Sequence, residues 1–327
     1  MFRYRLTDSM HNTSFRCVFA SAVMLAAIVL NGCSNFSVQR IAAEVAVPVE
    51  SRDGEAQYAI ATQTGRVGRI VVPVTINGQS DFHLMLDTGA THSVLTPQAA
   101  DRLGLDMSKA TVSEVQGVTG RLNAPVMRIS QLQAGSLKLQ DLSVPIIDGA
   151  VVSGLDGILG VDGMNGKAIS ADFVRDRIRI ADGSTLPANA LYAVIKFALV
   201  SNRLVVVDGM VGRVPVRAVI DTGGTQTLGN MALLRALAKL HKNQIGIDSG
   251  VTDITDQSQN GRLILGPDIK IGAATITNAP ILFSDFTVFS IWHLDKRPTL
   301  LIGMDVLGQL GELSINYRRQ ELQVRSR

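Results

Sequence analysis

The feature that most constrains this sequence is the tripeptide Asp-Thr-Gly, which occurs as Asp87-Thr88-Gly89 and again as Asp221-Thr222-Gly223. One copy alone carries little information, because a chain of this length often contains one by chance. Here an apolar run precedes each copy, and the upstream segments align without a gap at an offset of 134 residues (221 − 87). Two further pairs of segments match in the same order: Gly157–Gly160 with Leu300–Gly303, and Ile169–Phe173 with Leu313–Tyr317. This shared order predicts two copies of one domain.

Between these segments the sequence consists mostly of short runs rich in Val and Ile, separated by turns of Gly, Asn and Asp, as is typical of β-proteins. Two short helices are the clearest exceptions. Thr96, Pro97 and Gly104 fit the N-cap, first position and end of one helix, and Asn230 fits the N-cap of another that runs to about Leu240. We therefore expect a mainly β fold of two homologous, β-barrel-like lobes with a few short helices.

The repeat also sets the expected domain boundaries. The amino-terminal lobe is expected over residues 58–182 and the carboxy-terminal lobe over residues 192–327, with a turn-rich linker at residues 183–191. The chain has 327 residues, 46% of them apolar, which is enough for two compact cores. One chain therefore supplies both Asp-Thr-Gly loops.

The amino terminus has the pattern of an export signal. Basic residues precede an uncharged apolar run at positions 18–30, which is shorter than the ~20 residues of a transmembrane helix. The run ends in Leu30-Asn31-Gly32-Cys33, which resembles the lipobox of bacterial lipoproteins, where the signal is cut before a Cys that carries lipid. The alternative is an ordinary cleaved signal with an incidental Cys.

On this interpretation residues 1–32 are a lipoprotein signal peptide, residues 33–57 are a tether, and lipid on Cys33 attaches the protein to a membrane. Ser34 follows the Cys, where Asp would be a retention signal. By analogy with bacterial lipoprotein sorting, we expect the protein in the bacterial cell envelope, at the periplasmic face of the outer membrane.

Charge and cysteine use exclude several classes of function. Residues 1–32 hold three of the 31 basic residues and one of the 28 acidic residues, which leaves 28 against 27. There is thus no basic field for nucleic acid. Cys17 leaves with the signal and Cys33 carries lipid, so the mature chain has no disulfide and no thiolate site, and its His residues show no metal-ligand spacing. We expect no metal and no cofactor.

Two Asp side chains held face to face provide both an acid and a base. Carboxyls within hydrogen-bond distance do not both ionise readily, so Asp87 and Asp221 would share one proton over a broad range of pH. The ionised member can take a proton from water while the protonated member polarises a carbonyl oxygen, and the water then attacks an amide. Asp87 and Asp221 are therefore the candidate catalytic residues.

The neighbouring residues are candidates for supporting these loops. Thr88 and Thr222 carry short hydroxyls that could cross-link the two loops. Gly89 and Gly223 would let the backbone turn sharply, so that amide N–H groups can donate to the carboxylates.

These motifs resemble those of the pepsin-like and retropepsin-like aspartic proteases. The resemblance rests on the loops Leu86–Thr91 and Ile220–Thr225 and on the two apolar-apolar-Gly elements that end at Gly160 and Gly303, and it spans nearly the whole mature chain. It implies two lobes with the Asp pair in the cleft between them, Gly160 and Gly303 beneath the loops, and an extended peptide or protein substrate under flaps. Since one chain supplies both Asp residues, a monomer is sufficient for catalysis.

The sequence differs from the pepsin-like pattern beside the loops. Pepsin-like enzymes usually place Ser or Thr after Asp-Thr-Gly, where this chain has Ala90 and Gly224. Without that hydroxyl the ionised carboxyl is less favoured, which predicts an activity optimum less acidic than that of pepsin.

The flaps differ as well. The expected first flap, Val115–Gly120, lacks a Tyr and would contact substrate through Gln116, Gly117 and Thr119. The second repeat is longer between its motifs, and the extra residues are expected near positions 248–261, as a second flap or a substrate-selecting loop.

The residues allow less specific alternatives. A fold that has lost activity would leave a catalytically silent envelope lipoprotein that binds a peptide or partner in the same cleft, although two intact loops favour an aspartic endopeptidase. His92 could tune the Asp pair, contact substrate or simply lie on the surface. Asp162 and Asp305 are explained by capping of helix starts.

Overall fold

The computed structural model describes residues 49–50, 56–59, 68–184, 193–200, 203–240 and 246–326. The predicted signal, Cys33 and most of the predicted tether lie outside these residues. All of the described residues belong to one compact unit, Ala43–Arg327. In this part of the chain no helix has the length and apolar character needed to cross a membrane.

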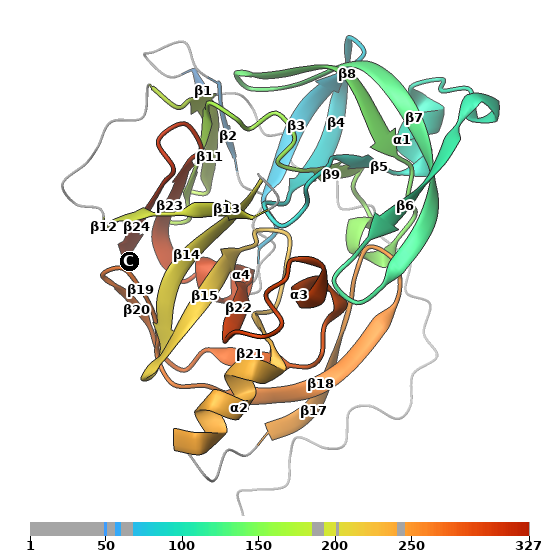
Figure 1. Ribbon diagram of the computed structural model, residues 1–327. Helices are drawn as coiled ribbons and strands as arrows, with labels where there is room; N and C mark the ends of the chain where they lie inside the picture. Colours follow the sequence, from blue (N-terminus) through green and yellow to red (C-terminus); the bar gives the residue numbers. More distant parts are fainter. Residues whose placement is uncertain are drawn as a thin grey trace, which may run out of the picture. The chain divides into compact units, whose positions relative to one another are not determined.

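The first lobe is built on a sheet of seven strands in the order β5-β9-β4-β3-β7-β6, with β8 paired to β7 (Figure 1). Its strands are β3 (Val71–Ile76), β4 (Gln79–Leu86), β5 (Val94–Leu95), β6 (Thr111–Gln116), β7 (Arg121–Ala134), β8 (Leu137–Pro145) and β9 (Gly157–Leu159). Its helical segments are α1 (Pro97–Arg102), η1 (Met107–Lys109) and η2 (Ala150–Val152).

The second lobe repeats this plan around a sheet in the order β17-β18-β21-β16-β22-β15-β14-β19-β20, with β13 paired to β14. Its strands are β13 (Ala198–Val200), β14 (Leu204–Val211), β15 (Val214–Ile220), β16 (Leu228–Gly229), β17 (Gly246–Thr252), β18 (Ser258–Leu265), β19 (Ile269–Ile271), β20 (Ala274–Ile276), β21 (Pro280–Phe283) and β22 (Thr299–Ile302). Its helices are α2 (Met231–Leu240), α3 (Thr287–Ile291) and α4 (Met304–Leu307). The prediction of a mainly β fold with two lobes and few helices is confirmed.

A third sheet, in the order β1-β2-β11-β10-β23-β24-β12, joins the two repeats. Its strands are β1 (Val49–Glu50), β2 (Ala56–Ala59), β10 (Lys167–Asp172), β11 (Arg177–Asp182), β12 (Ala193–Lys196), β23 (Leu310–Asn316) and β24 (Glu321–Ser326). The matched segments of the two repeats pair directly, with Ile169 opposite Ile315. Strand β1 and part of β2 fall within the range expected to be a tether, so part of that range contributes strands to this sheet.

Local sequence explains the elements that position the loops. Strand β3 alternates, with Val72, Val74 and Ile76 facing the core, as a half-buried strand requires. Both helix predictions are confirmed: the Thr96 hydroxyl accepts a hydrogen bond from the amide of the third residue of α1, and the Asn230 side chain does the same in α2. A single apolar cluster runs through both lobes, so the lobes share a core.

Candidate active site

Parallel strand pairs place the two Asp-Thr-Gly loops. Strand β4 runs beside β9, and the Asp87 amide donates to the Leu159 carbonyl at 3.0 Å. Strand β15 runs beside β22 in the same way, and the Asp221 amide donates to the Ile302 carbonyl at 3.0 Å. Each loop therefore leaves its sheet at the same point relative to its apolar-apolar-Gly partner.

Gly160 and Gly303 lie directly beneath the loops. A Cβ atom added at Gly160 would come within 2.6 Å of the His92 carbonyl oxygen, and one added at Gly303 within 2.6 Å of the Gln226 carbonyl oxygen. Real Cβ atoms essentially never come this close, so both positions require glycine because the loop backbone crosses there.

The two loops are hydrogen-bonded to each other through their threonines. The Thr88 hydroxyl donates to the Ile220 carbonyl at 2.8 Å and accepts from the Thr222 amide at 3.1 Å. The Thr222 hydroxyl donates to the Leu86 carbonyl at 2.9 Å and accepts from the Thr88 amide at 3.1 Å. All four groups are buried, so these bonds hold the loops at a defined separation.

The carboxyl groups sit in matching cradles of backbone amides. Asp87 Oδ1 accepts from the amides of Gly89 at 2.7 Å and Ala90 at 3.0 Å. Asp221 Oδ1 accepts from the amides of Gly223 at 2.9 Å and Gly224 at 3.0 Å. The inner oxygen of each carboxyl is thereby fixed, and the two side chains hydrogen-bond to each other.

The glycines of the two loops lie against the opposite carboxyl. A Cβ at Gly89 would be 2.7 Å from Asp221 Oδ1, and one at Gly223 would overlap Asp87 Cγ. As predicted, the backbone turns at Gly89, and the amides of both glycines donate to the carboxyl of their own loop. Neither glycine has a positive φ, so the turn alone does not require glycine. They are required because each loop packs directly onto the catalytic candidate of the other lobe.

Electrostatics make the pair asymmetric. Burial raises the pKa of Asp87, while hydrogen bonds from Asp221 and from the loop amides oppose the rise. The pKa of Asp221 is raised well above its ordinary value, first by burial and then by the charge of Asp87 and the hydrogen bond to it. Asp221 is also the more buried of the two. These causes raise the pKa of Asp221 further than that of Asp87.

Asp162 braces the first loop, although the sequence assigned it to helix capping. Its carboxylate accepts from the Ser93 amide at 3.1 Å and from the Ser93 hydroxyl at 2.7 Å, and the same hydroxyl accepts from the Gly160 amide at 3.1 Å. These bonds tie the end of the loop to the strand beneath it.

Asp305 braces the second loop in the same way. It accepts from the Thr227 amide at 3.0 Å and hydroxyl at 2.7 Å, and that hydroxyl accepts from the Gly303 amide at 3.1 Å. Asp305 also lies in the first turn of α4, which agrees with its predicted place at a helix start, whereas no helix begins at Asp162. This bracing could have been predicted from the repeat, because each loop has a hydroxyl residue six positions after its Asp and a second Asp two positions after its buried Gly.

His92 is exposed, and its Nδ1 lies 3.0 Å from the Thr91 hydroxyl. Arg203 of the second lobe donates to the Thr91 carbonyl. The side chain reaches solvent, but neighbouring protein atoms partly desolvate the ring, and this desolvation and then the Arg203 charge lower the pKa of His92. The contact with Thr91 favours the surface alternative for this His over a role in tuning the Asp pair.

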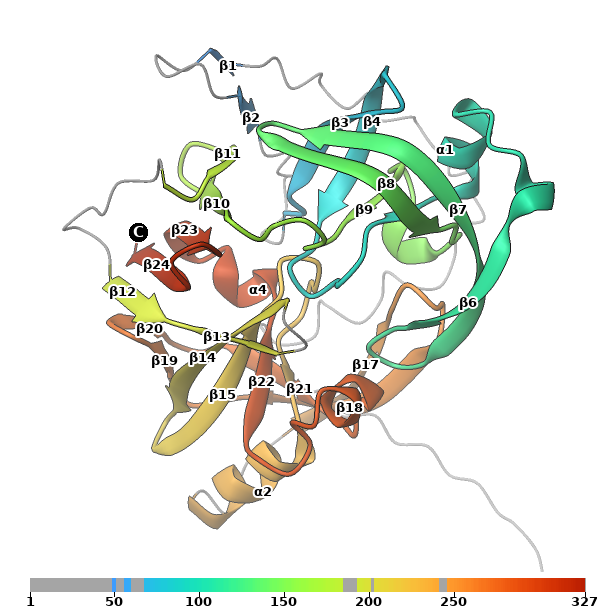
Figure 2. The same cartoon turned by 45° about the horizontal axis from the view of Figure 1, so that its top comes forward.

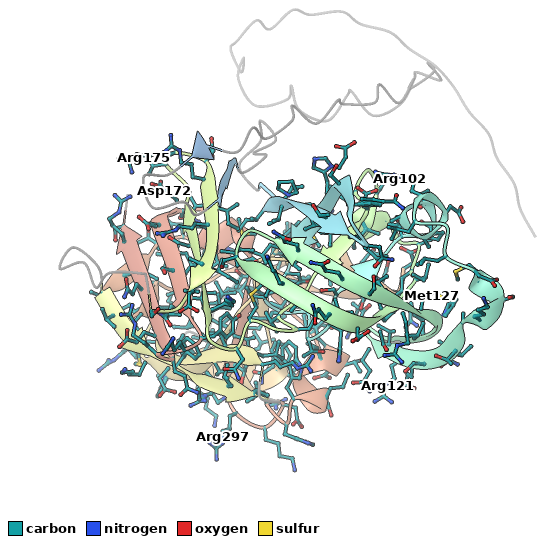
Figure 3. All side chains as sticks on the ribbon, turned by 90° about the horizontal axis from the view of Figure 1, so that it is seen from above. Arg102, Arg121, Met127, Asp172, Arg175 and Arg297 are labelled. Atoms are coloured by element: carbon teal, nitrogen blue, oxygen red, sulfur yellow. The ribbon has the colours of Figure 1, made fainter. Side chains whose placement is uncertain are left out.

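Two hairpins carry the predicted flaps. Strands β6 and β7 form the first, with Gln116, Gly117 and Thr119 at or beside its tip, where the Gly117 amide donates to the Gly120 carbonyl at 2.8 Å. Its stem carries an ion pair of 3.3 Å between Arg121 and Glu114, and Figure 3 shows Arg121 at the edge of the molecule. Strands β17 and β18 form the second hairpin, so the longer segment of the second repeat is a second flap-like hairpin.

The tips of these hairpins are hydrogen-bonded to each other, and we call this set of bonds the clasp. The Thr119 amide donates to Asp253 Oδ2 at 2.8 Å, and the Thr119 hydroxyl donates to the Gln257 carbonyl at 2.8 Å. The Gln257 side chain donates in return to the Arg121 carbonyl at 3.0 Å. Figure 2 shows the first hairpin reaching toward α3, where the Val288 amide donates to the Val118 carbonyl at 3.2 Å.

The tips also exchange apolar side chains. Val118 of the first hairpin packs against a second-lobe cluster that includes Phe286 and Phe289. Ile254 of the second hairpin packs against a first-lobe cluster, alongside Ala90 and the stem residues Val115 and Leu122. Ala90, which directly follows Gly89, therefore packs against the same cluster as both hairpins.

Among the residues that the structure describes, no group of three or more His, Cys, Asp or Glu is placed to hold a metal ion.

A family model described as aspartyl protease matches residues 72–162 and 205–306. Each matched range contains one Asp-Thr-Gly loop with its buried Gly and its bracing Asp. No match was found among curated proteins.

Proposed function

The chain belongs to the aspartyl protease family, and on that premise we propose that it is an aspartic endopeptidase that hydrolyses peptide bonds in the cleft between its lobes. The observation that carries the proposal is the geometry of the Asp pair: Asp87 and Asp221 hydrogen-bond to each other, in matching amide cradles, on loops cross-linked by Thr88 and Thr222. A binding protein has no need of this arrangement.

The asymmetry of the pair assigns the roles. Asp87, the ionised member, takes a proton from a water lying between the carboxyls as the water oxygen attacks the peptide carbonyl carbon. Asp221, the protonated member, donates to the carbonyl oxygen as negative charge develops there. When the tetrahedral intermediate collapses, the C–N bond breaks and the nitrogen takes the proton held by Asp87. Asp221 takes back a proton from the oxygen to which it had donated one.

The proposed substrate is an extended peptide or a protein segment that lies under the hairpins, near Gln116, Gly117 and Thr119. One chain supplies both carboxyls, so a monomer is sufficient. The proposal includes removal of residues 1–32, lipid on Cys33 and a place at the periplasmic face of the outer membrane, supported by the sequence pattern at Leu30–Cys33. Replacing Cys33 with Ala should abolish incorporation of labelled fatty acid and release the protein from membranes; labelling that persists would refute the anchor.

The test of activity is incubation of the purified protein with a peptide library from pH 3 to pH 8, read by mass spectrometry. We expect discrete cleavage sites that are lost in Asp87→Asn, with the variant still folded. Absence of cleavage at every pH, or unchanged cleavage by Asp87→Asn, would leave the catalytically silent binding protein as the better account.

A further inference from the structure

Asp253 is an acidic side chain buried at the tip of the second hairpin, with 7% of its surface exposed. Its Oδ1 accepts from the amide of Thr255 at 2.8 Å and from the Thr255 hydroxyl at 2.5 Å, within its own turn. Its Oδ2 accepts from the amide of Thr119, on the other hairpin. One carboxylate thus shapes its own turn with one oxygen and holds the opposite flap with the other.

The clasp fits closely around this side chain. A Cβ at Gly117 would overlap Asp253 Oδ2, and a Cβ at Gly120 would overlap the Gln257 side chain. A buried carboxylate needs hydrogen bonds in place of water, and bonds to a charged acceptor are roughly twice as strong as neutral ones. The bond from Thr119 is therefore the one expected to hold the clasp shut.

The clasp closes a ring of protein. The first hairpin is fixed to the first lobe by the pairing of β7 with β3, and the second to its own lobe by the pairing of β18 with β21. The loops at the base are joined by Thr88 and Thr222. Whatever lies between the Asp pair and the joined tips is encircled, and a polymer enters a closed ring only by one of its ends.

We propose that Asp253 is a specificity-determining residue: by latching the clasp, it restricts the site to polypeptides that thread from a free end, and internal segments enter only when the latch opens. This inference rests on the proposed protease function. It predicts that a linear peptide is cleaved much faster than a backbone-cyclic peptide of the same sequence.

Asp253→Asn removes the latch and keeps the turn. An amide has one oxygen and one NH₂ group. With the oxygen accepting from Thr255, the NH₂ group faces the Thr119 amide, and two donors meet. Asp295→Asn is the matched control, because Asp295 is an exposed acid of the same lobe, outside both hairpins between α3 and β22, and the change removes the same charge.

The experiment compares kcat/KM for two substrates with one cleavage sequence, a linear peptide and a cyclic peptide of about 30 residues closed through a Gly/Ser spacer, which leaves an extended conformation accessible. For the wild type and Asp295→Asn we expect the linear peptide to be favoured at least tenfold. For Asp253→Asn we expect that preference to fall at least fivefold. Any conformational cost of the cycle is common to all three proteins and cancels from this comparison.

Hydrogen exchange of the Thr119 amide, measured without substrate, gives a readout that does not depend on catalysis. We expect at least tenfold faster exchange in Asp253→Asn and no change in Asp295→Asn. Three results would overturn the inference and leave the protease function intact: equal cleavage of both peptides by the wild type, an unchanged preference in Asp253→Asn, or an effect of Asp295→Asn equal to that of Asp253→Asn. Failure of the wild type to cleave the linear peptide would instead overturn the proposed function, and this inference with it.

Discussion

Replacing Thr88 with Val removes one hydroxyl from the junction of the two lobes and leaves the shape of the side chain unchanged. The Thr222 amide then loses its acceptor in a buried position, and the Ile220 carbonyl loses a donor at 2.8 Å. A buried unsatisfied group costs about 1–3 kcal/mol and a lost hydrogen bond about 0.5–1.5 kcal/mol. We therefore expect Thr88→Val to lower the free energy of unfolding by about 2–4 kcal/mol, a large part of the 5–15 kcal/mol typical of whole proteins.

The assay is urea denaturation followed by the fluorescence of Trp292, the only Trp in the chain. Thr88→Ser keeps the hydroxyl and loses one buried methyl group, so it should cost only about 1 kcal/mol. Thr91→Val is the control, since its exposed hydroxyl contacts only the neighbouring His92 ring among the bonds described, and it should change stability by less than about 0.5 kcal/mol. A Thr88→Val variant as stable as the wild type, or a Thr88→Ser variant as unstable as Thr88→Val, would refute the argument that the hydroxyl holds the lobes together.

Three further outcomes follow from the loops. Burial raises the pKa of Asp221, so the stability that this group contributes is complete below the unfolded-state pKa of about 3.9 and is lost as pH rises through the folded-state value. In urea denaturation, the free energy of unfolding of Asp221→Asn should therefore equal that of the wild type near pH 3 and exceed it at pH 7. Ala90→Ser would place a hydroxyl donor near the Asp87 carboxylate and lower its pKa, so the acidic limb of the profile of kcat/KM against pH should move to lower pH, and an unmoved limb would count against the explanation given for the mild optimum. Gly223→Ala would displace the Asp87 carboxyl, and a shift of about 1 Å at a reacting group lowers the reaction rate on the order of 100-fold. The rate of peptide cleavage should therefore fall by that factor, while the circular dichroism spectrum stays unchanged.

Much of the site could be predicted because it is repeated. Two loops with the same residues at a constant offset indicated two lobes, and the glycines at 160 and 303 could be placed because short matching motifs kept their order. The helix starts at Thr96 and Asn230 could be predicted because capping depends only on residues three positions apart.

The remaining features depend on contacts between distant residues. The pairing of β10 with β23 links the two repeats, and nothing in either strand alone distinguishes a partner in its own lobe from one in the other. The bond between Thr119 and Asp253 spans 134 residues, and Asp253 reads as an ordinary polar residue of a surface loop. The requirement for glycine at position 89 could not be predicted for the same reason, because it comes from the opposite carboxyl and not from its own φ.

The central claim is that one carboxyl from each lobe is required to cleave a peptide bond. It is tested most directly by kcat/KM for a single identified peptide from pH 3 to pH 8 in the wild type, Asp87→Asn and Asp221→Asn. We predict a bell-shaped profile for the wild type and, for each variant, a rate lower by on the order of 100-fold or more at the optimum, because a proton-transfer group contributes about 10²–10⁴. Cleavage by either variant at the wild-type rate would contradict the account.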